Sequence, residues 1–276
     1  MKVYDLLNLV YWKIYFILKF FQIKIGNNTT EIFLLKNIYK TIGLPNILDI
    51  GANKGQKTDI FLCLNFKSKV KLFEPFKEYF IRLKKKYKNL QNIEIYNFGV
   101  GKFNSNKNFF ISKEKQNSEA FSFKKMPYHN KKVTVKIRKI DTYFKYIKKI
   151  DLIKIDVEQL EIDVLIGAKS LIKNDRPIIF LETTNANINK IETYFQKLNF
   201  IIYAYEYYIF KDGKFVFENP ILSWTEKNVQ KSNVYGRKLY PLKVFKNIKS
   251  YMLNLIAIPK EKGSIIKNLS VEKSYE

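Results

Sequence analysis

Short apolar runs alternate with amphipathic stretches along the chain from about residue 45 onward. Five apolar runs have the length of buried strands: 46–50, 70–74, 93–98, 151–156 and 177–182. Amphipathic stretches with the spacing of helices lie between or after them, at 55–65, 76–87, 157–173 and 187–198. This alternation predicts an α/β domain in which helices cover a mostly parallel sheet.

The pattern changes after the fifth of these strands. Residues 200–217 have the pattern of two strands joined by the turn KDG, which predicts a hairpin. The apolar residues 250–259 predict a late strand that pairs antiparallel with this hairpin. Residues 104–130 are polar and predict an irregular excursion, whereas 133–140 alternates like an exposed strand. Residues 218–249 lack periodicity, and a connection of that length is typical of a lid or a binding loop.

The first 25 residues are apolar but interrupted by charges, so no uninterrupted run approaches the roughly 20 residues that a membrane span needs. On a helix, the large apolar side chains share one face and the charged side chains, mostly lysine, share the opposite one. We expect this helix to pack on the domain or on a second subunit of a dimer. The alternative is peripheral contact of residues 1–25 with an anionic membrane surface.

The chain therefore divides into three predicted parts. Residues 1–44 form an amphipathic helical segment and residues 45–259 form the main domain. The stretches 104–130 and 218–249 are insertions on its substrate side, and residues 260–276 form a C-terminal tail.

Composition narrows the classes of function. A single cysteine, Cys63, excludes an intramolecular disulfide and indicates a reducing, cytoplasmic compartment, and a single histidine, His129, excludes a multi-histidine metal site. The formal net charge of +25 suits nucleic acid, an anionic membrane or a phosphate-bearing substrate. The lysines are spread along the chain among many Ile, Asn, Phe and Tyr residues, which is typical of a compositional bias. The net charge alone therefore does not distinguish between these three kinds of partner.

Two of only 10 glycines follow the first predicted strand, in ILDIGANKGQ (47–56). Ligands of open α/β sheets bind at the carboxyl ends of the strands, where Gly51 and Gly55 fall. Gly51 permits a sharp turn, and the absence of side chains lets a ligand approach the backbone. The alternative is a purely structural turn.

A second feature favours a ligand. Glu74 ends the next strand, 25 residues after Asp49, where an acidic residue binds the hydroxyls of a ribose. Asn53 occupies the position of the second glycine in a dinucleotide-binding GxGxxG motif, and that glycine exists to admit a pyrophosphate. These residues predict a cofactor that contains adenosine without yet identifying it. Asn53 disfavours a pyrophosphate, and a cofactor without phosphates would not need that glycine.

Four segments together resemble the motifs of FkbM-type methyltransferases, which use S-adenosyl-L-methionine. They are LDIGANKGQ (48–56), LFEPF (72–76), IDLIKIDVEQLEIDVLIGA (150–168) and IIFLE (178–182), within a resemblance that covers roughly residues 45–200. It implies a Rossmann-like class I methyltransferase fold: a mostly parallel seven-stranded sheet with helices on both faces and an antiparallel last strand. The sequence departs from the family at Gln159, where glycine is usual.

The resemblance also implies roles for individual residues. Glu74 matches the residue that binds the ribose hydroxyls, with Pro75 beside the adenine, and Phe98 lies where the third strand approaches the adenine. Asp156 and Glu158 match positions beside the methyl group. The remaining implied cofactor-binding residues belong to the first motif: Asp49, Gly51, Ala52, Asn53, Gly55 and Gln56.

Methyl transfer to a hydroxyl benefits from a positioned base. The candidate catalytic residues at the strand ends are Asp156, Glu158 and Glu182, although Asp156 also suits a contact with the amine of the cofactor. For Glu161 we expect the role of a helix N-terminal acid. The three candidates suit magnesium or calcium as oxygen ligands, but strand-end carboxylates are common without a metal and we predict no metal site.

Lys154 lies inside a predicted buried strand, where an unpaired ammonium group is costly. We expect it to form an ion pair that links its strand to the one carrying Asp49. It would thereby orient carboxylates around the catalytic site.

The leading functional hypothesis is an O-methyltransferase acting on a small or carbohydrate acceptor. The resemblance suggests a sugar, free or nucleotide-linked, of a surface polysaccharide such as capsule or lipopolysaccharide, methylated in the cytoplasm or at the inner face of the membrane. Four aromatic residues in the insertions would stack on the sugar or form a small core: Phe121, Phe123, Tyr128 and Trp224. The alternatives are a non-catalytic adapter and a nucleic-acid methyltransferase. The latter is disfavoured because DVEQ stands where an Asn/Asp-Pro-Pro-aromatic motif is expected.

Overall fold

The computed structural model describes residues 30–112, 120–122, 131–143, 149–157, 159–184, 186–211, 214–217, 238–242, 251–267 and 270–271. The predictions for residues 1–25, Glu158, Phe123, Tyr128 and Trp224 lie outside these ranges, and so does His129. Of Phe121 only the main chain is described. In the described part of the chain, no helix is long and apolar enough to cross a membrane.

Seven strands form the central sheet in the order β3-β2-β1-β8-β9-β13-β10. β1 pairs in parallel with β2 and β8, β2 with β3 and β8 with β9, whereas β13 is antiparallel to β9 and β10. The predicted fold class is therefore confirmed. The strands span Asn46–Ile50 (β1), Lys69–Phe73 (β2), Ile93–Tyr96 (β3), Leu152–Ile155 (β8), Ile178–Thr184 (β9), Phe200–Lys211 (β10) and Tyr251–Pro259 (β13).

Short strands extend the sheet beyond β10. The predicted hairpin is present, because β11 (Lys214–Phe217) pairs antiparallel with β10. β12 (Lys238–Pro241) also pairs with β10, and β14 (Ser270–Val271) pairs in parallel with β12.

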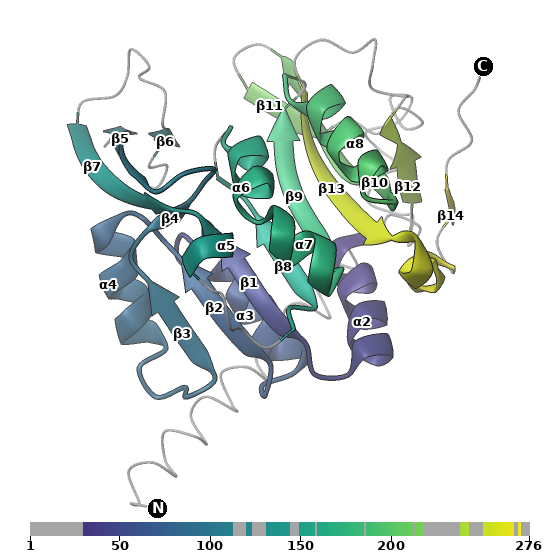
Figure 1. Cartoon of the computed structure of the whole chain (residues 1–276), viewed down its shortest axis with the longest axis horizontal. Coiled ribbons are helices and arrows are strands. Elements are labelled where there is room, and N and C mark those ends of the chain that lie inside the picture. Colours follow the sequence, from purple (N-terminus) through teal and green to yellow (C-terminus); the bar gives the residue numbers. More distant parts are fainter. Residues whose placement is uncertain are drawn as a thin grey trace, which may run out of the picture.

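Helices cover both faces of the sheet (Figure 1). On one face, α2, α3 and α4 pack over a core that includes Leu35, Phe61 and Leu83. On the other face, α5, α6, α7 and α8 pack over a core that includes Val164 and Phe195. The helices span Thr30–Ile42 (α2), Gln56–Leu64 (α3), Lys77–Lys86 (α4), Ile140–Tyr143 (α5), Glu161–Gly167 (α6), Lys169–Asp175 (α7) and Ile188–Lys197 (α8).

The polar stretch 104–130 was predicted to be irregular, but part of it forms strands. Its described residues form β5 (Ser105–Ser112) and β6 (Ala120–Ser122), which build a second sheet with β4 (Gly99–Val100) and β7 (Lys131–Arg138) in the order β4-β7-β5-β6. Phe109 and Ile137 of this sheet form a small core with Phe76 and Tyr79. Figure 1 shows the second sheet beyond the carboxyl ends of β1, β2 and β3.

Two further predictions were wrong in detail. The helix predicted to run from 157 to 173 is two helices, α6 and α7, which meet at Ala168. The predicted C-terminal tail begins with a 3-10 helix, η2 (Lys260–Ile266), that packs on α2. Ile265 is buried there, and the side-chain amide of Asn37 donates a hydrogen bond to its carbonyl oxygen at 3.2 Å.

Candidate functional site

A cleft lies at the carboxyl ends of β1, β2 and β8. The strand order reverses at β1, which is where open α/β sheets bind ligands. The cleft contains about 640 Å³ of empty space, a volume that includes open solvent. Its lining comes from strand ends, the turns after them, α4 and the second sheet: Ile50, Gly51, Asn53, Glu74, Pro75, Phe76, Tyr79, Gly99, Val100, Phe109, Asp156, Val157 and Leu160.

The glycines of the β1–α3 turn are required by the packing of the chain itself. Gly51 has a φ of 82°, and a Cβ atom there would lie 1.8 Å from the main-chain oxygen of Asp156. Gly55 has a φ of 80°, and a Cβ atom there would lie 2.4 Å from the hydroxyl oxygen of Tyr87. Both positions need glycine for backbone conformation and for space. The sequence left a purely structural turn open as the alternative, but it did not identify these two protein neighbours.

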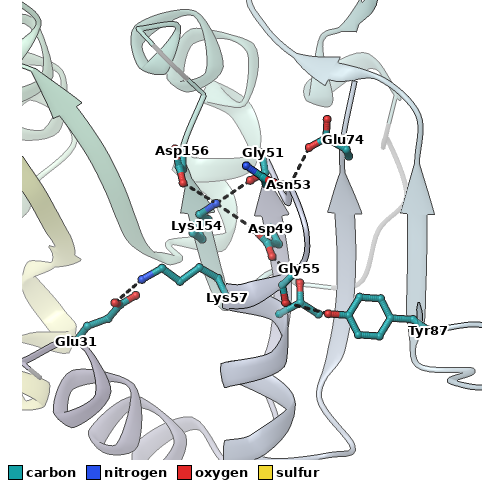
Figure 2. A network of polar contacts seen from close by, with 11 residues as sticks. Glu31, Asp49, Gly51, Asn53, Gly55, Lys57, Glu74, Tyr87, Lys154 and Asp156 are labelled. Carbon is teal, nitrogen blue, oxygen red and sulfur yellow. Dashed lines mark hydrogen bonds and ion pairs between the residues drawn. The ribbon is translucent and has the colours of Figure 1, made fainter. Parts of the chain in front are cut away.

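A polar cluster behind the turn holds Gly55 in place. The hydroxyl oxygen of Tyr87 lies 2.9 Å from the carbonyl oxygen of Gly55 and 2.9 Å from a carboxylate oxygen of Asp59 (Figure 2 shows the contact between Tyr87 and Gly55). The ammonium group of Lys86 donates to Asp59 at 2.8 Å and to the carbonyl oxygen of Lys54 at 3.1 Å. None of these supporting residues was predicted, because their separation in sequence gives no signal of their contact.

Glu74 lies in the cleft directly after β2, as predicted. Its two carboxylate oxygens accept hydrogen bonds from the main-chain amides of Asn53 and Phe76, each at 2.8 Å. The carboxylate thus ties the glycine turn to the start of α4. Figure 2 shows the contact between Glu74 and Asn53. Each carboxylate oxygen has two lone pairs, so both oxygens retain the capacity to accept another hydrogen bond.

Burial raises the pKa of Glu74 from its ordinary value of 4.5 to about 7, although the two amide hydrogen bonds and the charge of Lys154 lower it. Because folding raises this pKa, the folded chain holds a proton between pH 4.5 and about pH 7 that the unfolded chain releases. The corresponding stability is fully present below pH 4.5 and is lost as the pH rises through about 7.

Lys154 connects the carboxyl ends of β1 and β8. Its ammonium group donates to the carbonyl oxygen of Gly51 at 2.8 Å and lies 3.2 Å from Asp156 and 3.5 Å from Asp49 (Figure 2). Asp49 and Lys154 are register partners, so the predicted ion pair between the two strands is present. Asp49 is completely buried, and its second carboxylate oxygen accepts a hydrogen bond from the hydroxyl of Thr58.

The charge state of Lys154 follows from these neighbours. Burial lowers the pKa of its ammonium group, but the carboxylates of Asp156 and Asp49 outweigh this effect and raise the pKa to about 12. The side chain is therefore a fixed positive charge beneath the cleft. Only Asp156 of the three charged groups is substantially exposed, with 37% of its side chain accessible against 8% for Lys154.

Several predicted site residues lie near the cleft but do not line it. Ala52 and Phe98 are buried in the two cores on opposite faces of the sheet, and Phe98 packs against Phe73 and Tyr96. Gln56 is the exposed first residue of α3. Glu182 lies one strand farther along the sheet, on β9, and its charge acts on Lys154.

The structure adds residues and hydrogen bonds that the motifs did not reveal. Phe109 comes from the second sheet and, with Tyr79, closes the cleft beside Phe76. The stretch that carries Phe109 looked irregular in sequence, so no pattern identified it. The side-chain amide of Asn97 donates to the carbonyl oxygens of Glu74 and Pro75, at 3.0 and 3.1 Å, and fixes the turn after β2.

The described residues contain no group of three His, Cys, Asp or Glu side chains placed to hold a metal ion. Glu158, one of the three carboxylates considered for such a site, is not among them.

Comparison with solved structures returned methyltransferases at low similarity. The methyltransferase FkbM from Methylobacillus flagellatus KT is 16% identical with a TM-score of 0.44, and the match covers 58% of this chain and 39% of that one. Precorrin-6y C5,15-methyltransferase from Geobacter metallireducens GS-15 is 8% identical with a TM-score of 0.42, over 79% and 81% of the two chains. Fibrillarin from Aeropyrum pernix, solved with natively bound S-adenosyl-L-methionine, is 12% identical with a TM-score of 0.38, over 57% and 58%.

These similarities are too low to assign a family to the chain. The chain spans only 39% of the length of the Methylobacillus structure, and a comparison with curated protein sequences gives no match. The sequence profile of the methyltransferase FkbM domain, however, matches residues 49–209, which is more than half of the chain and contains the glycine turn, Glu74 and Lys154. The chain belongs to the FkbM-domain methyltransferase family.

Proposed function

We propose that the chain is an S-adenosyl-L-methionine-dependent O-methyltransferase that acts on a hydroxyl group of a small or carbohydrate acceptor. The observation that carries the proposal is the buried carboxylate of Glu74, presented to the cleft beside the turn of Gly51 and Asn53. A carboxylate at the end of the second strand, next to a glycine turn, suits the two hydroxyls of a ribose.

The side chains that line the cleft fit this cofactor. Both oxygens of Glu74 can each accept one more hydrogen bond, which matches two ribose hydroxyls. Phe76, Tyr79 and Phe109 supply aromatic and apolar surface for an adenine ring. The turn has Asn53 rather than a glycine at the position where a pyrophosphate would approach, which is in keeping with a cofactor without phosphates.

The bound cofactor would supply an electrophilic methyl group on a sulfonium, and the residues of the chain supply position and charge. The turn at Gly51 and the end of β8 are fixed to each other by Lys154, so the two sides of the cleft keep a constant separation. Holding the reacting groups in line is the main catalytic contribution for a displacement of this kind.

Asp156 is the charged group we assign to the acceptor. It lines the cleft, it is the most exposed carboxylate of the Lys154 network, and it can accept the proton of an approaching hydroxyl. If it instead binds the amine of the cofactor, its removal lowers cofactor affinity rather than turnover. Glu182 on the neighbouring strand is the second candidate base.

A sugar of a surface polysaccharide, modified in the cytoplasm or at the inner membrane face, remains our preferred acceptor. The formal charge of +25 keeps RNA in the acceptor screen. An adapter that binds the cofactor without turnover is the remaining alternative.

The test is calorimetric titration of the purified chain with S-adenosylhomocysteine, with NAD as the control ligand. We expect micromolar binding of S-adenosylhomocysteine and none of NAD, and loss of binding in Glu74→Ala. Glu94→Ala is the matched control, because Glu94 is an exposed carboxylate on the neighbouring strand β3, paired with Lys71 and absent from the cleft. Folded wild-type protein that binds no S-adenosylhomocysteine would overturn the proposal.

The role of Asp156 is then separable by measuring methyl transfer beside the binding titration. If Asp156 is the base, Asp156→Asn loses turnover on sugar or RNA acceptors while its affinity for S-adenosylhomocysteine is unchanged. Wild-type protein that binds the cofactor but methylates no hydroxyl acceptor would support the hypothesis of a non-catalytic adapter.

A further inference from the structure

Glu161 is a buried carboxylate whose contacts extend beyond its own helix. It is the first residue of α6, and only 3% of the residue is exposed. Burial raises its pKa, against hydrogen bonds from the amides of Gln159 and of Glu161 itself and from Asn187. A helix N-terminal acid, the role expected from sequence, needs only solvent and the helix dipole, so its burial requires another explanation.

One carboxylate oxygen of Glu161 bonds the turn before α6, and the other contacts residues that follow α7. One accepts a hydrogen bond from the main-chain amide of Gln159 at 2.8 Å. The other accepts from the side-chain amide of Asn187 at 2.9 Å and lies 3.5 Å from the hydroxyl of Thr183. Thr183 is in β9 and Asn187 directly precedes α8, so one carboxylate joins the β8–α6 turn to two elements that follow it. Figure 1 shows α6 beside β9, with α8 beyond it.

The turn that Glu161 anchors forms one wall of the cleft. Asp156, Val157 and Leu160 all line the cleft, and each lies between the end of β8 and the start of α6. Within this turn Gln159 has a φ of 75°, a conformation disfavoured for any residue with a side chain. The amide that Glu161 holds is the amide of this disfavoured residue.

We propose that Glu161 is a positioning residue: its carboxylate holds the turn between β8 and α6 against β9 and the start of α8, and so sets the wall of the cleft that carries Asp156 and Leu160. The inference rests on the proposed methyltransferase function, since this wall faces the methyl-bearing part of the cofactor in that proposal. Glu161 acts only through the turn, because it does not itself line the cleft.

The test uses the affinities of the full chain for S-adenosylmethionine and for S-adenosylhomocysteine. These ligands differ in the transferred methyl group and its charge, so the ratio of their affinities reports the wall beside the methyl group. A general loss of stability lowers the folded fraction for both ligands alike and leaves the ratio unchanged. Denaturation midpoints, measured in parallel, show which variants are folded.

Three variants decide the question. Glu161→Ala removes the anchor, and we expect weaker binding by about tenfold, with a ratio that differs from that of the wild type. Glu161→Gln places a second amide opposite Asn187 and is expected to behave similarly. The double variant Glu161→Gln/Asn187→Asp exchanges donor and acceptor, so that the pair can form again, and we expect wild-type affinities and ratio.

Asp141→Ala is the matched control. The carboxylate of Asp141 also accepts two main-chain hydrogen bonds, from the amides of Ser170 and Leu171 at 2.8 and 3.0 Å, but it anchors α7 and does not line the cleft. We expect a lower denaturation midpoint with an unchanged ratio.

Each outcome decides for or against the proposal. If the wild type binds neither ligand, the proposed function fails and this inference fails with it. If the wild type binds both ligands but folded Glu161→Ala keeps its affinities and their ratio, the inference alone is wrong. If Glu161→Ala does not fold, the same judgement is made from Glu161→Gln, and an equal ratio in the single and the double variant would overturn the inference.

Discussion

Replacing Lys154 with methionine tests whether the buried ion pair holds the carboxyl ends of β1 and β8 together. Methionine has a similar length and no charge, so the change removes the ammonium group while retaining most of the packing. Three contacts are lost at once: the hydrogen bond to the carbonyl oxygen of Gly51 and the ion pairs with Asp49 and Asp156.

The magnitude follows from the burial of the partners. Asp49 is 0% exposed, and one of its carboxylate oxygens has no hydrogen bond, so the ammonium group is its main compensation on that side. Removing one partner of a buried ion pair costs about 3–5 kcal/mol, because an uncompensated charge is left behind. A typical domain is stable by about 5–15 kcal/mol, so Lys154→Met should fold but unfold at a clearly lower denaturant concentration.

The assay is equilibrium urea unfolding, and two further variants sharpen it. Lys107→Met is the control: its partner Asp163 lies at 3.1 Å, but both side chains are more than one-third exposed, so about 0–1 kcal/mol is expected. Lys154→Met/Asp49→Asn removes both charges and should recover part of the loss. A Lys154→Met variant as stable as Lys107→Met, or no recovery in the double variant, would refute the buried-pair argument.

Two other predictions concern the cleft. The affinity for S-adenosylhomocysteine should increase from pH 6 to pH 8, because burial raises the pKa of Glu74 to about 7 and its carboxyl group loses its proton over that range. Calorimetry on Glu74→Gln should show no such increase. An increase that persists in this variant would contradict the assignment to Glu74. Gln159→Gly should stabilise the fold by about 1 kcal/mol in urea unfolding, because glycine adopts a φ of 75° without strain and retains the amide bonded to Glu161. A neutral or destabilising effect would mean that this residue is not left-handed in solution.

Local patterns in the sequence were sufficient to predict the sheet. The apolar run of β8, with all four residues buried, and the amphipathic stretches on either side indicate a central parallel strand without any tertiary information. The hairpin of β10 and β11 is similarly local, since a KDG turn separates two apolar runs. Of the second sheet only the strand β7 was predicted, at 133–140. β5 was missed because its sequence is largely polar and it buries only Phe109 against α4.

The candidate site was predicted in part. Glu74 and the glycine turn were found because they lie at fixed offsets from predicted strand ends. The tertiary structure decided what those residues do to one another: the glycines are required by Asp156 and Tyr87 as well as by any ligand. Phe98 was predicted beside the adenine, but its side chain is buried in a core and does not line the cleft, because a position at the end of a strand does not fix which way the side chain points.

The sequence by itself determined the succession of the main strands and helices along the chain, the site at the carboxyl ends of the strands, and the need for Lys154 to find a negative partner. These features depend on periodicity and on the cost of burying a charge, which are properties of short segments. Only the tertiary structure decided the partners of Glu161 and the closure of the cleft by Phe109. Such contacts join residues 22 to 26 or more positions apart, and they arise from how the elements pack rather than from any local preference of the chain.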